Sequence, residues 1–280
     1  MLRPFFTYYG GKWRAALSYP RPVFQTIVEP FAGSAGYSTR HHKRRVVLVD
    51  KDPHIVGVWS YLIRESSAAI RALPDVPPEG GVDALGVCQE ARWLIGFWLN
   101  KGAAAPCKTP SKWMRGGTHA TSFWGSAVRE RIASQVDKIR HWEVIDGSYR
   151  DAPRIEATWF VDPPYEQAGK HYRCGADEID FADLASWCRT LRGQAIVCEN
   201  AGASWLPFGH HASIKSNRGT SHEAVWCSGP QSLQTWLPGS EPGCSPREAA
   251  GDAENLNDSE AGYRFRTGDI QLGKQARSQR

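Results

Sequence analysis

An acidic and aromatic quartet, Asp162-Pro163-Pro164-Tyr165, follows the apolar run of residues 159–161. Two consecutive prolines preset φ and lack N–H donors, so they hold a carboxylate, a backbone carbonyl and an aromatic ring in one rigid turn. An amino group on a flat ring can donate one hydrogen to each of the two acceptors while the ring stacks on the tyrosine. The quartet therefore predicts a pocket for an aromatic amine. The alternative interpretation is a turn with a purely structural role.

A second candidate site is the stretch from Glu29 to Gly36, which reads EPFAGSAG. Glycines and small residues between a strand and a helix let a ligand approach the backbone and the N–H groups of the helix. Asp50 ends the next apolar run about 20 residues on, where an acid in doubly wound folds commonly accepts the ribose hydroxyls. Loop and acid together predict a nucleoside ligand. The loop is not GxGxxG and lacks the GK[ST] of a P-loop, so neither a dinucleotide oxidoreductase nor a nucleotide hydrolase is favoured.

These candidate residues need a sheet to position them. Short apolar runs that end in an acid recur along the chain and predict strands at 26–29, 46–50, 159–162 and 195–199. Helix-compatible stretches between them give a β-α-β rhythm. Asp180 is expected to cap a helix that runs through Leu191 and stops at Gly193, with Ile179 and Leu184 as a hydrophobic staple. The sequence therefore predicts an α/β fold with a mostly parallel sheet and ligands at the carboxyl ends of its strands.

Four segments in this order carry a resemblance to a known family: Tyr9-Gly10-Gly11-Lys12, Glu29–Gly36, Asp50 and Asp162–Tyr165. The chain resembles the Dam-type family (D12 class) of S-adenosylmethionine-dependent DNA adenine N6-methyltransferases, which includes many phage enzymes. The similarity spans about residues 5–228. It implies a Rossmann-like class I methyltransferase sheet with an inserted, mainly helical target-recognition domain. Residues 216–218 and 223–226 resemble the closing antiparallel hairpin of such sheets.

The resemblance also implies roles for individual residues. In the family, the GGK segment and the EPF loop hold the methionine part of S-adenosyl-L-methionine, the acid after the second strand binds its ribose, and the DPPY binds the flipped adenine. The implied catalytic residues are Asp162, Pro163 and Tyr165. The implied cofactor-binding residues are Tyr9, Lys12, Glu29, Phe31, Gly33, Asp50, Ser148, Tyr149 and Asp162.

One position departs from the family pattern. Family members usually have an Asp before an aromatic residue shortly upstream of the DPPY strand, where the Asp reads the cofactor adenine. Here the stretch is Asp146-Gly147-Ser148-Tyr149, with Ser148 in the Asp position. A serine hydroxyl still accepts a hydrogen bond but lacks the strength that a charge adds. We expect a weaker hold on the cofactor.

The segment 80–142 lies where the family inserts its target-recognition domain. It carries nine basic and four acidic residues and five of the 12 tryptophans (93, 98, 113, 124 and 142). Basic loops interleaved with aromatics suit phosphate contacts and base stacking in double-stranded DNA. Trp93 and Trp98 are expected in a core instead. The candidate DNA-binding residues are Lys108, Lys112, Arg115 and Arg129, together with Lys170, Tyr172 and Arg173 in a basic loop after the DPPY.

Composition narrows the class of protein. The 280 residues and 41% hydrophobic content fit a soluble globular protein, with catalytic segments at 1–79 and 143–230 and a disordered tail at 231–280. No apolar run reaches the length of a membrane span, and the first residues lack a signal peptide. Seven cysteines without a CxxC pair favour a reducing cytoplasm, and the family resemblance implies that of a bacterial or phage-infected host cell. His210 and His211 lack a third ligand, so no metal is expected.

Other functions stay open at this point. An N4-cytosine methyltransferase shares the pocket logic but typically has Ser-Pro-Pro-Tyr. Methylases of RNA or of protein glutamine usually have Asn-Pro-Pro-Tyr and lack the early GGK. A DNA-binding protein with a decayed methyltransferase fold is a further alternative, for which Ser148 is the indication.

Overall fold

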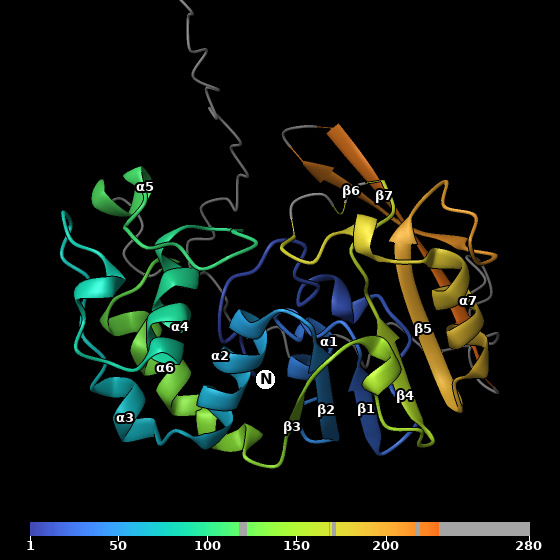
Figure 1. The fold of residues 1–280 in the computed structure, drawn as a ribbon, viewed down its shortest axis with the longest axis horizontal. Coiled ribbons are helices and arrows are strands. Elements are labelled where there is room, and N and C mark those ends of the chain that lie inside the picture. The colour runs from blue at the N-terminus through green and yellow to red at the C-terminus, as the bar shows by residue number, and fades with distance from the viewer. Residues whose placement is uncertain (118–121, 168, 170–171, 217–218, 230–280) are drawn as a thin grey trace, which may run out of the picture.

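A seven-stranded sheet forms the centre of the protein (Figure 1). The computed structural model describes residues 1–117, 122–167, 169, 172–216 and 219–229. The sheet order is β3-β2-β1-β4-β5-β7-β6. Its strands are β1 (Thr26–Glu29), β2 (Arg45–Asp50), β3 (Glu143–Asp146), β4 (Ala157–Val161), β5 (Gly193–Asn200), β6 (Gly209–Ser216) and β7 (Gly219–Ser228).

The strands β1 to β5 pair in parallel, while β7 runs antiparallel to β5 and to β6. Parallel strands lie on both sides of the central β1, and an antiparallel hairpin forms one edge of the sheet. This is the Rossmann-like methyltransferase arrangement, so the expected fold class is confirmed. The four predicted runs are all strands, with ends that differ by up to two residues. The hairpin is also present, although Asn217 and Arg218 of its turn lie outside the described residues.

Sequence reasoning did not predict β3. This strand is only four residues long, its sequence is EVID, and it lies at the edge of the sheet beside β2. Its end residues, Glu143 and Asp146, are exposed acids. An edge strand buries less apolar surface than a central one, so its apolar signal is weak.

Helices lie on both sides of the sheet, as a parallel sheet requires. They include α1 (Gly36–Arg40), α2 (Pro53–Arg64) and α7 (Phe181–Thr190). The Asp180 side chain accepts from the backbone N–H groups of Ala182 and Asp183, so it caps α7 as expected, although the helix ends one residue before Leu191. Short 3-10 turns lie at Ala15–Leu17, Val82–Ala84, Asp137–Ile139, Tyr149–Asp151 and Ala176–Glu178.

Both faces of the sheet are buried. Successive strand residues point to opposite faces, so each strand contributes to two hydrophobic clusters. Ile27 of β1 belongs to one hydrophobic cluster and its neighbour Val28 to the other. The first cluster takes in the N-terminal Phe5 and Phe6 and the α2 residue Trp59. The second takes in residues of α7. The ends of the strands are therefore held rigidly, which fixes the loops that follow them.

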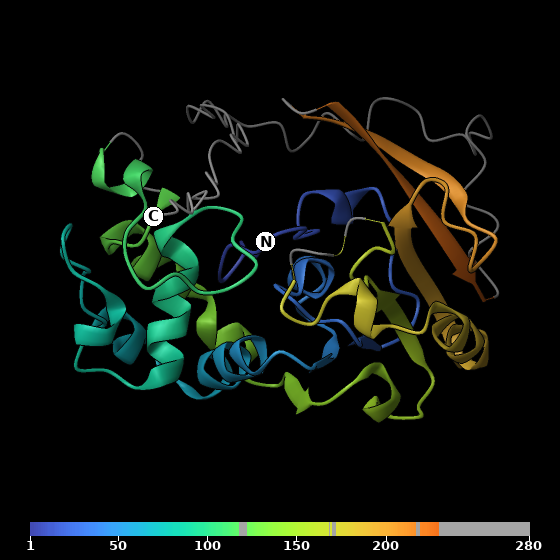
Figure 2. The ribbon, with the colours of Figure 1, turned by 45° about the horizontal axis from the view of Figure 1, so that its top comes forward.

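A helical segment gathers at the side of the molecule away from β5, β6 and β7 (Figures 1 and 2). It comprises α3 (Ser67–Arg71), α4 (Gln89–Leu99), α5 (Lys112–Arg115) and α6 (Ser126–Val136). α3 packs on α6 and α4 on α2, so the helical segment begins before residue 80. Its apolar residues continue the first cluster of the sheet. Trp98 is buried and Trp93 packs against this cluster, whereas Trp113 is 52% exposed.

Several sequence features fall outside the described residues, namely the tail at 231–280 and Lys170. Within the described part, no helix is long and apolar enough to cross a membrane. The same residues contain no group of three or more potential metal ligands.

Candidate active site

A hollow opens at the carboxyl ends of β1 and β4, where the sequence places its candidate residues. Three separate segments meet there: the GGK segment, the glycine loop after β1 and the turn after β4. The residues that line it are Tyr8–Lys12, Glu29, Phe31–Gly36, Asp52, Phe160, Asp162, Pro164, Tyr172 and Cys174. The structure therefore brings together in one hollow most of the segments that carry the family resemblance.

Asp162 presents an unused acceptor in this hollow. Its Oδ1 is buried and has no hydrogen-bond partner among the described residues, and the nearest cation, Lys12 Nζ, lies 3.5 Å away. Burial raises the pKa of the carboxyl to about 6, and the charge of Glu223 adds to that rise while the Lys12 ammonium opposes it. Leaving a buried acceptor unpaired is costly. A ligand that donates a hydrogen to Oδ1 would remove this cost.

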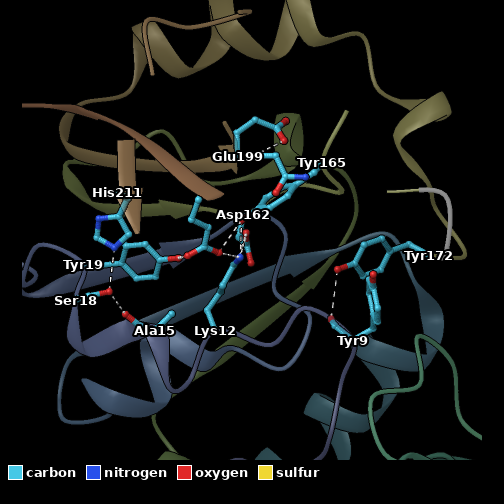
Figure 3. A network of polar contacts seen from close by, with 12 residues as sticks. Tyr9, Lys12, Ala15, Ser18, Tyr19, Asp162, Tyr165, Tyr172, Glu199 and His211 are labelled. Atoms are coloured by element: carbon cyan, nitrogen blue, oxygen red, sulfur yellow. Dashed lines mark hydrogen bonds and ion pairs between the residues drawn. The ribbon is translucent and has the colours of Figure 1, made fainter. Parts of the chain in front are cut away.

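Lys12 lies at the centre of a polar network beside Asp162 (Figure 3). Its ammonium donates to the Tyr165 hydroxyl and to Glu223 Oε1, and it stands 4.6 Å from the centre of the Tyr165 ring. Burial disfavours the ammonium, but the carboxylates of Asp162 and Glu223 outweigh this effect and raise the pKa of Lys12. Tyr165 itself lines neither hollow; its hydroxyl is tied to Lys12 and, at 3.2 Å, to Glu223.

Asp50 is engaged by the backbone around it. Its Oδ2 accepts from Gly33 N at 2.9 Å and its Oδ1 from Asp52 N at 2.9 Å. Gly33 has a φ of 44°, a left-handed conformation that favours glycine. The carboxylate therefore fixes the glycine loop in place. An ionised oxygen accepts more than one hydrogen bond, so Asp50 keeps capacity for the expected ribose contact.

A second hollow adjoins the first, and the two share Phe31, Pro164 and Cys174. Asp50 and Tyr149 also line it, and the Tyr149 ring stacks on Phe31 with their centres 5.7 Å apart. Flat aromatic walls suit a flat ring. The expected cofactor residues Phe31, Asp50 and Tyr149 thus meet at this second hollow.

Ser148 lies in neither hollow. Its hydroxyl donates to Asp151 Oδ2 at 2.9 Å and accepts from Arg150 N, which starts the 3-10 turn that follows β3. A hydroxyl oxygen has two lone pairs, so Ser148 keeps one acceptor position for the expected contact with a cofactor adenine. Pro163, the expected second acceptor, is buried and also lines neither hollow.

The residues expected to bind DNA are placed in different ways. Lys108 pairs with Asp83 at 2.9 Å on the surface, and Arg115 donates to the Pro110 carbonyl. Arg129 pairs with Asp75 and lies over the Trp124 ring, with 15% of its side chain exposed. These contacts give Arg129 a packing role within the helical segment.

Two further members of that set lie after the DPPY turn. The Tyr172 hydroxyl donates to the Tyr9 carbonyl at 3.3 Å, so this tyrosine lines the first hollow rather than an outer surface. Arg173 is exposed beside it. Contact with Tyr172 also explains Gly10, where a Cβ atom would lie 2.4 Å from the Tyr172 hydroxyl.

Sequence reasoning missed three polar residues of this site. Glu223 is a buried acid on β7, Tyr19 donates to Glu223 Oε2 at 2.7 Å, and Asp52 has a buried, unpartnered Oδ2. A signal existed for Glu223. It directly precedes the apolar residues 224–226 of the expected hairpin, and buried acids are rare unless they are paired.

Glu29 gives a prediction about stability that does not depend on catalysis. The side chain is 2% exposed, and burial raises the pKa of its carboxyl from 4.5 to about 8, although Ser38 N donates to Oε1. The unfolded chain ionises Glu29 near pH 4.5 while the folded protein keeps it neutral. The stability that this group contributes is therefore full below about pH 4.5 and is lost as the pH rises to about 8.

Glu29→Gln removes this titration and keeps the acceptor oxygen. We expect the unfolding free energy of the unsubstituted protein to fall relative to Glu29→Gln between about pH 4.5 and 8. Other buried acids titrate in both proteins and cancel in the difference. Denaturant unfolding at several pH values measures it. A difference that is constant with pH would contradict a neutral Glu29.

The comparisons with known proteins leave the family open. No protein-family model matches the chain, and the curated proteins gave no match. Among solved structures, the proposed methyltransferase yhhF from Escherichia coli is 10% identical with a TM-score of 0.31, over 76% of this chain and 80% of that one. The proposed methylase HI0767 from Haemophilus influenzae is 10% identical with a TM-score of 0.30, over 73% and 80%. At these TM-scores the likenesses carry no argument.

Proposed function

We propose that the protein is a site-specific DNA methyltransferase that transfers the methyl group of S-adenosylmethionine to N6 of an adenine rotated out of a duplex. The observation that carries this proposal is the buried, unpartnered Oδ1 of Asp162 in the hollow that the glycine loop also lines. An amino hydrogen of a base is the donor that this oxygen lacks. The rigid turn of Pro163 and Pro164 keeps the oxygen in place without competing N–H groups.

The charges of the first hollow fit the cofactor. S-adenosylmethionine carries a sulfonium, an ammonium and one carboxylate, which leaves a net positive charge. The ionised side chains that line the hollow are Lys12, Asp52 and Asp162, two acids and one base, while Glu29 is held neutral by its burial. Asp52 adds a second buried oxygen without a partner. The second hollow offers the stacked rings of Phe31 and Tyr149 to an adenine.

The residues of the chain then orient the target nitrogen. In the proposed reaction Asp162 accepts one hydrogen from N6, so that the N6 lone pair no longer conjugates with the ring. The family resemblance assigns the second acceptor to the Pro163 carbonyl and the stacking surface to the Tyr165 ring, although neither residue lines a hollow in this structure. When bound, the cofactor supplies a methyl group whose bond to sulfur breaks as the bond to N6 forms, leaving a thioether. The proton that N6 loses passes to the Asp162 carboxylate and on to solvent. Rotating the base out costs a few kcal/mol of stacking and pairing.

Within the helical segment, the strongest support for a DNA partner comes from one exposed pair of residues on α5. Lys112 is exposed on α5 next to Trp113, the large ring of this segment that is half exposed. A cation and an exposed aromatic ring together suit a phosphate contact beside a base.

We expect Lys112→Ala to weaken duplex binding and to make the slope of log affinity against log salt shallower by about 0.9, since one phosphate contact is lost. Fluorescence anisotropy with a labelled duplex at several salt concentrations measures this slope. Arg45→Ala is the matched control, because Arg45 begins β2 at the opposite end of the sheet and pairs with Glu143. An unchanged slope for Lys112→Ala would contradict a phosphate contact there.

Incubation of the purified protein with genomic DNA and methyl-labelled S-adenosylmethionine, followed by sequencing that detects modified bases, tests the proposed function. N6-methyladenine at a defined sequence is the expected result. Modified cytosine would instead assign the N4-cytosine reaction. DNA that gains no label, while calorimetry detects no cofactor binding, would overturn the methyltransferase proposal and favour a decayed binding protein.

A further inference from the structure

Glu223 lies on β7, a strand of the closing hairpin that contributes none of the four motif segments, yet its carboxylate reaches the side chains beside Asp162. The side chain is 3% exposed. Its Oε1 accepts from Lys12 Nζ and from the Tyr165 hydroxyl, and its Oε2 accepts from the Tyr19 hydroxyl. Both oxygens are therefore used, and none is directed at the hollow.

The Lys12 ammonium has two carboxylates within reach and is hydrogen-bonded to only one of them. It donates to Glu223 and to the Tyr165 hydroxyl. Its Nζ also lies 3.5 Å from Asp162 Oδ1, but it makes no hydrogen bond with that oxygen. An isolated ammonium and carboxylate at this separation in a buried site would close to a direct, charge-assisted hydrogen bond. Such a bond would occupy Oδ1, the oxygen on which the proposed reaction depends.

We propose that Glu223 is a positioning residue that holds the Lys12 ammonium away from Asp162 and so keeps Asp162 Oδ1 open for the amino group of the substrate. This inference rests on the proposed function for the identity of that substrate. The contacts themselves do not depend on it. Tyr19 assists by fixing the far oxygen of Glu223, since its hydroxyl is buried and has Glu223 as acceptor.

The ionisation of Glu223 and Asp162 agrees with this arrangement. Burial alone would raise the pKa of Glu223, but the Lys12 ammonium and the hydrogen bonds from Lys12, Tyr19 and Tyr165 bring it below its ordinary value, so the carboxylate stays ionised. Glu223 in turn helps to raise the pKa of Asp162. The titratable side chains around this pair come from every neighbouring element: Lys12, Tyr19, Glu29, Asp162, Tyr165, Tyr172, Cys198 and His211.

Glu223→Gln tests the inference, because it removes the charge and keeps the shape. Lys12 should then pair directly with Asp162. We expect the rate of methyl transfer to fall about 10- to 100-fold, as for other groups that orient a reacting side chain. We also expect the acid limb of the pH–rate profile to move below about pH 6, because Asp162 loses a neighbouring negative charge and gains a closer cation.

Two variants separate this role from a structural one. Glu223→Asp keeps the charge and should leave the acid limb near its original pH, even where the shorter side chain lowers the rate. Glu199→Gln is the matched control, because Glu199 is a similarly buried acid on β5 that accepts from Glu166 N, Asn200 N and the Trp205 indole and contacts neither Lys12 nor Asp162. It should not move the limb. A limb that Glu223→Gln leaves in place would overturn the inference.

A readout without activity keeps the inference distinct from the proposed function. The pKa of Asp162 is about 6 in the folded protein and 3.8 in the unfolded chain, so ionisation of Asp162 lowers the unfolding free energy as the pH rises between these values. Asp162→Asn lacks this titration. In the Glu223→Gln background this pH-dependent difference between Asp162 and Asp162→Asn should shrink, because Asp162 titrates closer to its ordinary value. An undiminished difference would overturn the inference even where methyl transfer is established. Absent methyl transfer in the unsubstituted protein overturns only the proposed function.

Discussion

Asp162→Asn should reduce methyl transfer by on the order of 100- to 1000-fold or more, the cost of losing one group aimed at a reacting centre. The asparagine side chain keeps the size of the aspartate, but it lacks the negative charge and places an NH₂ group where one acceptor oxygen stood. It can neither stabilise the positive charge that develops on N6 nor take up its proton. Labelled methyl transfer at saturating DNA and cofactor measures the effect.

The fold and the DNA surface should survive this substitution. Asp162 follows β4, Lys12 keeps Glu223 as its counter-ion, and the exposed cations of the helical segment are unchanged. Duplex affinity measured by anisotropy should therefore stay close to that of the unsubstituted protein. Asp146→Asn is the matched control, because Asp146 is an exposed acid at the carboxyl end of β3, the edge strand of the same sheet. Turnover retained by Asp162→Asn would remove Asp162 from the mechanism.

Gly36→Ala should separate the two segments that form the floor of the first hollow. A Cβ atom at Gly36 would lie 2.4 Å from Trp13 N and 2.8 Å from the carbonyl carbon of Lys12. Both atoms belong to the backbone, so no side chain can swing aside to make room. The glycine loop and the GGK segment must move apart, and overpacking of this kind costs about 1–3 kcal/mol.

Two measurements follow the effect of Gly36→Ala. We expect calorimetry to show a lower unfolding temperature, by several degrees, and loss of most S-adenosylmethionine binding. Gly86→Ala is the matched control, because no other atom lies within 4 Å of a Cβ at that position. If Gly36→Ala unfolds at the same temperature as Gly86→Ala and binds the cofactor with the same affinity, the close packing of the two segments is not needed for the site.

Much of the fold could be predicted because its signals are local. The apolar runs that became β1, β2, β4 and β5, and the Asp180 cap of α7, each depend on a few consecutive residues. The edge strand β3 was missed because it is short and partly exposed. The helical segment was expected between 80 and 142, but α3 joins it from outside these limits by packing on α6.

The candidate site divides in the same way. The DPPY turn and the glycine loop were found because their backbone chemistry is written in neighbouring residues. The pairing partners of the charged side chains could not be found from neighbouring residues. Arg129, expected to contact phosphate, pairs with Asp75 beside Trp124, and Tyr172, expected in a loop that contacts DNA, lines the first hollow and donates to the Tyr9 carbonyl.

Local patterns were enough to locate the strand ends and the loops that follow them, because steric limits on proline and glycine and the period of apolar residues act over a few positions. The electrostatics of the site depend instead on contacts between distant segments. Lys12 and Glu223 are 211 residues apart, and they meet because β7 inserts antiparallel between β5 and β6. A carboxylate acquires its partner and its pKa from whatever the folded sheet places beside it, and no local pattern encodes that neighbour.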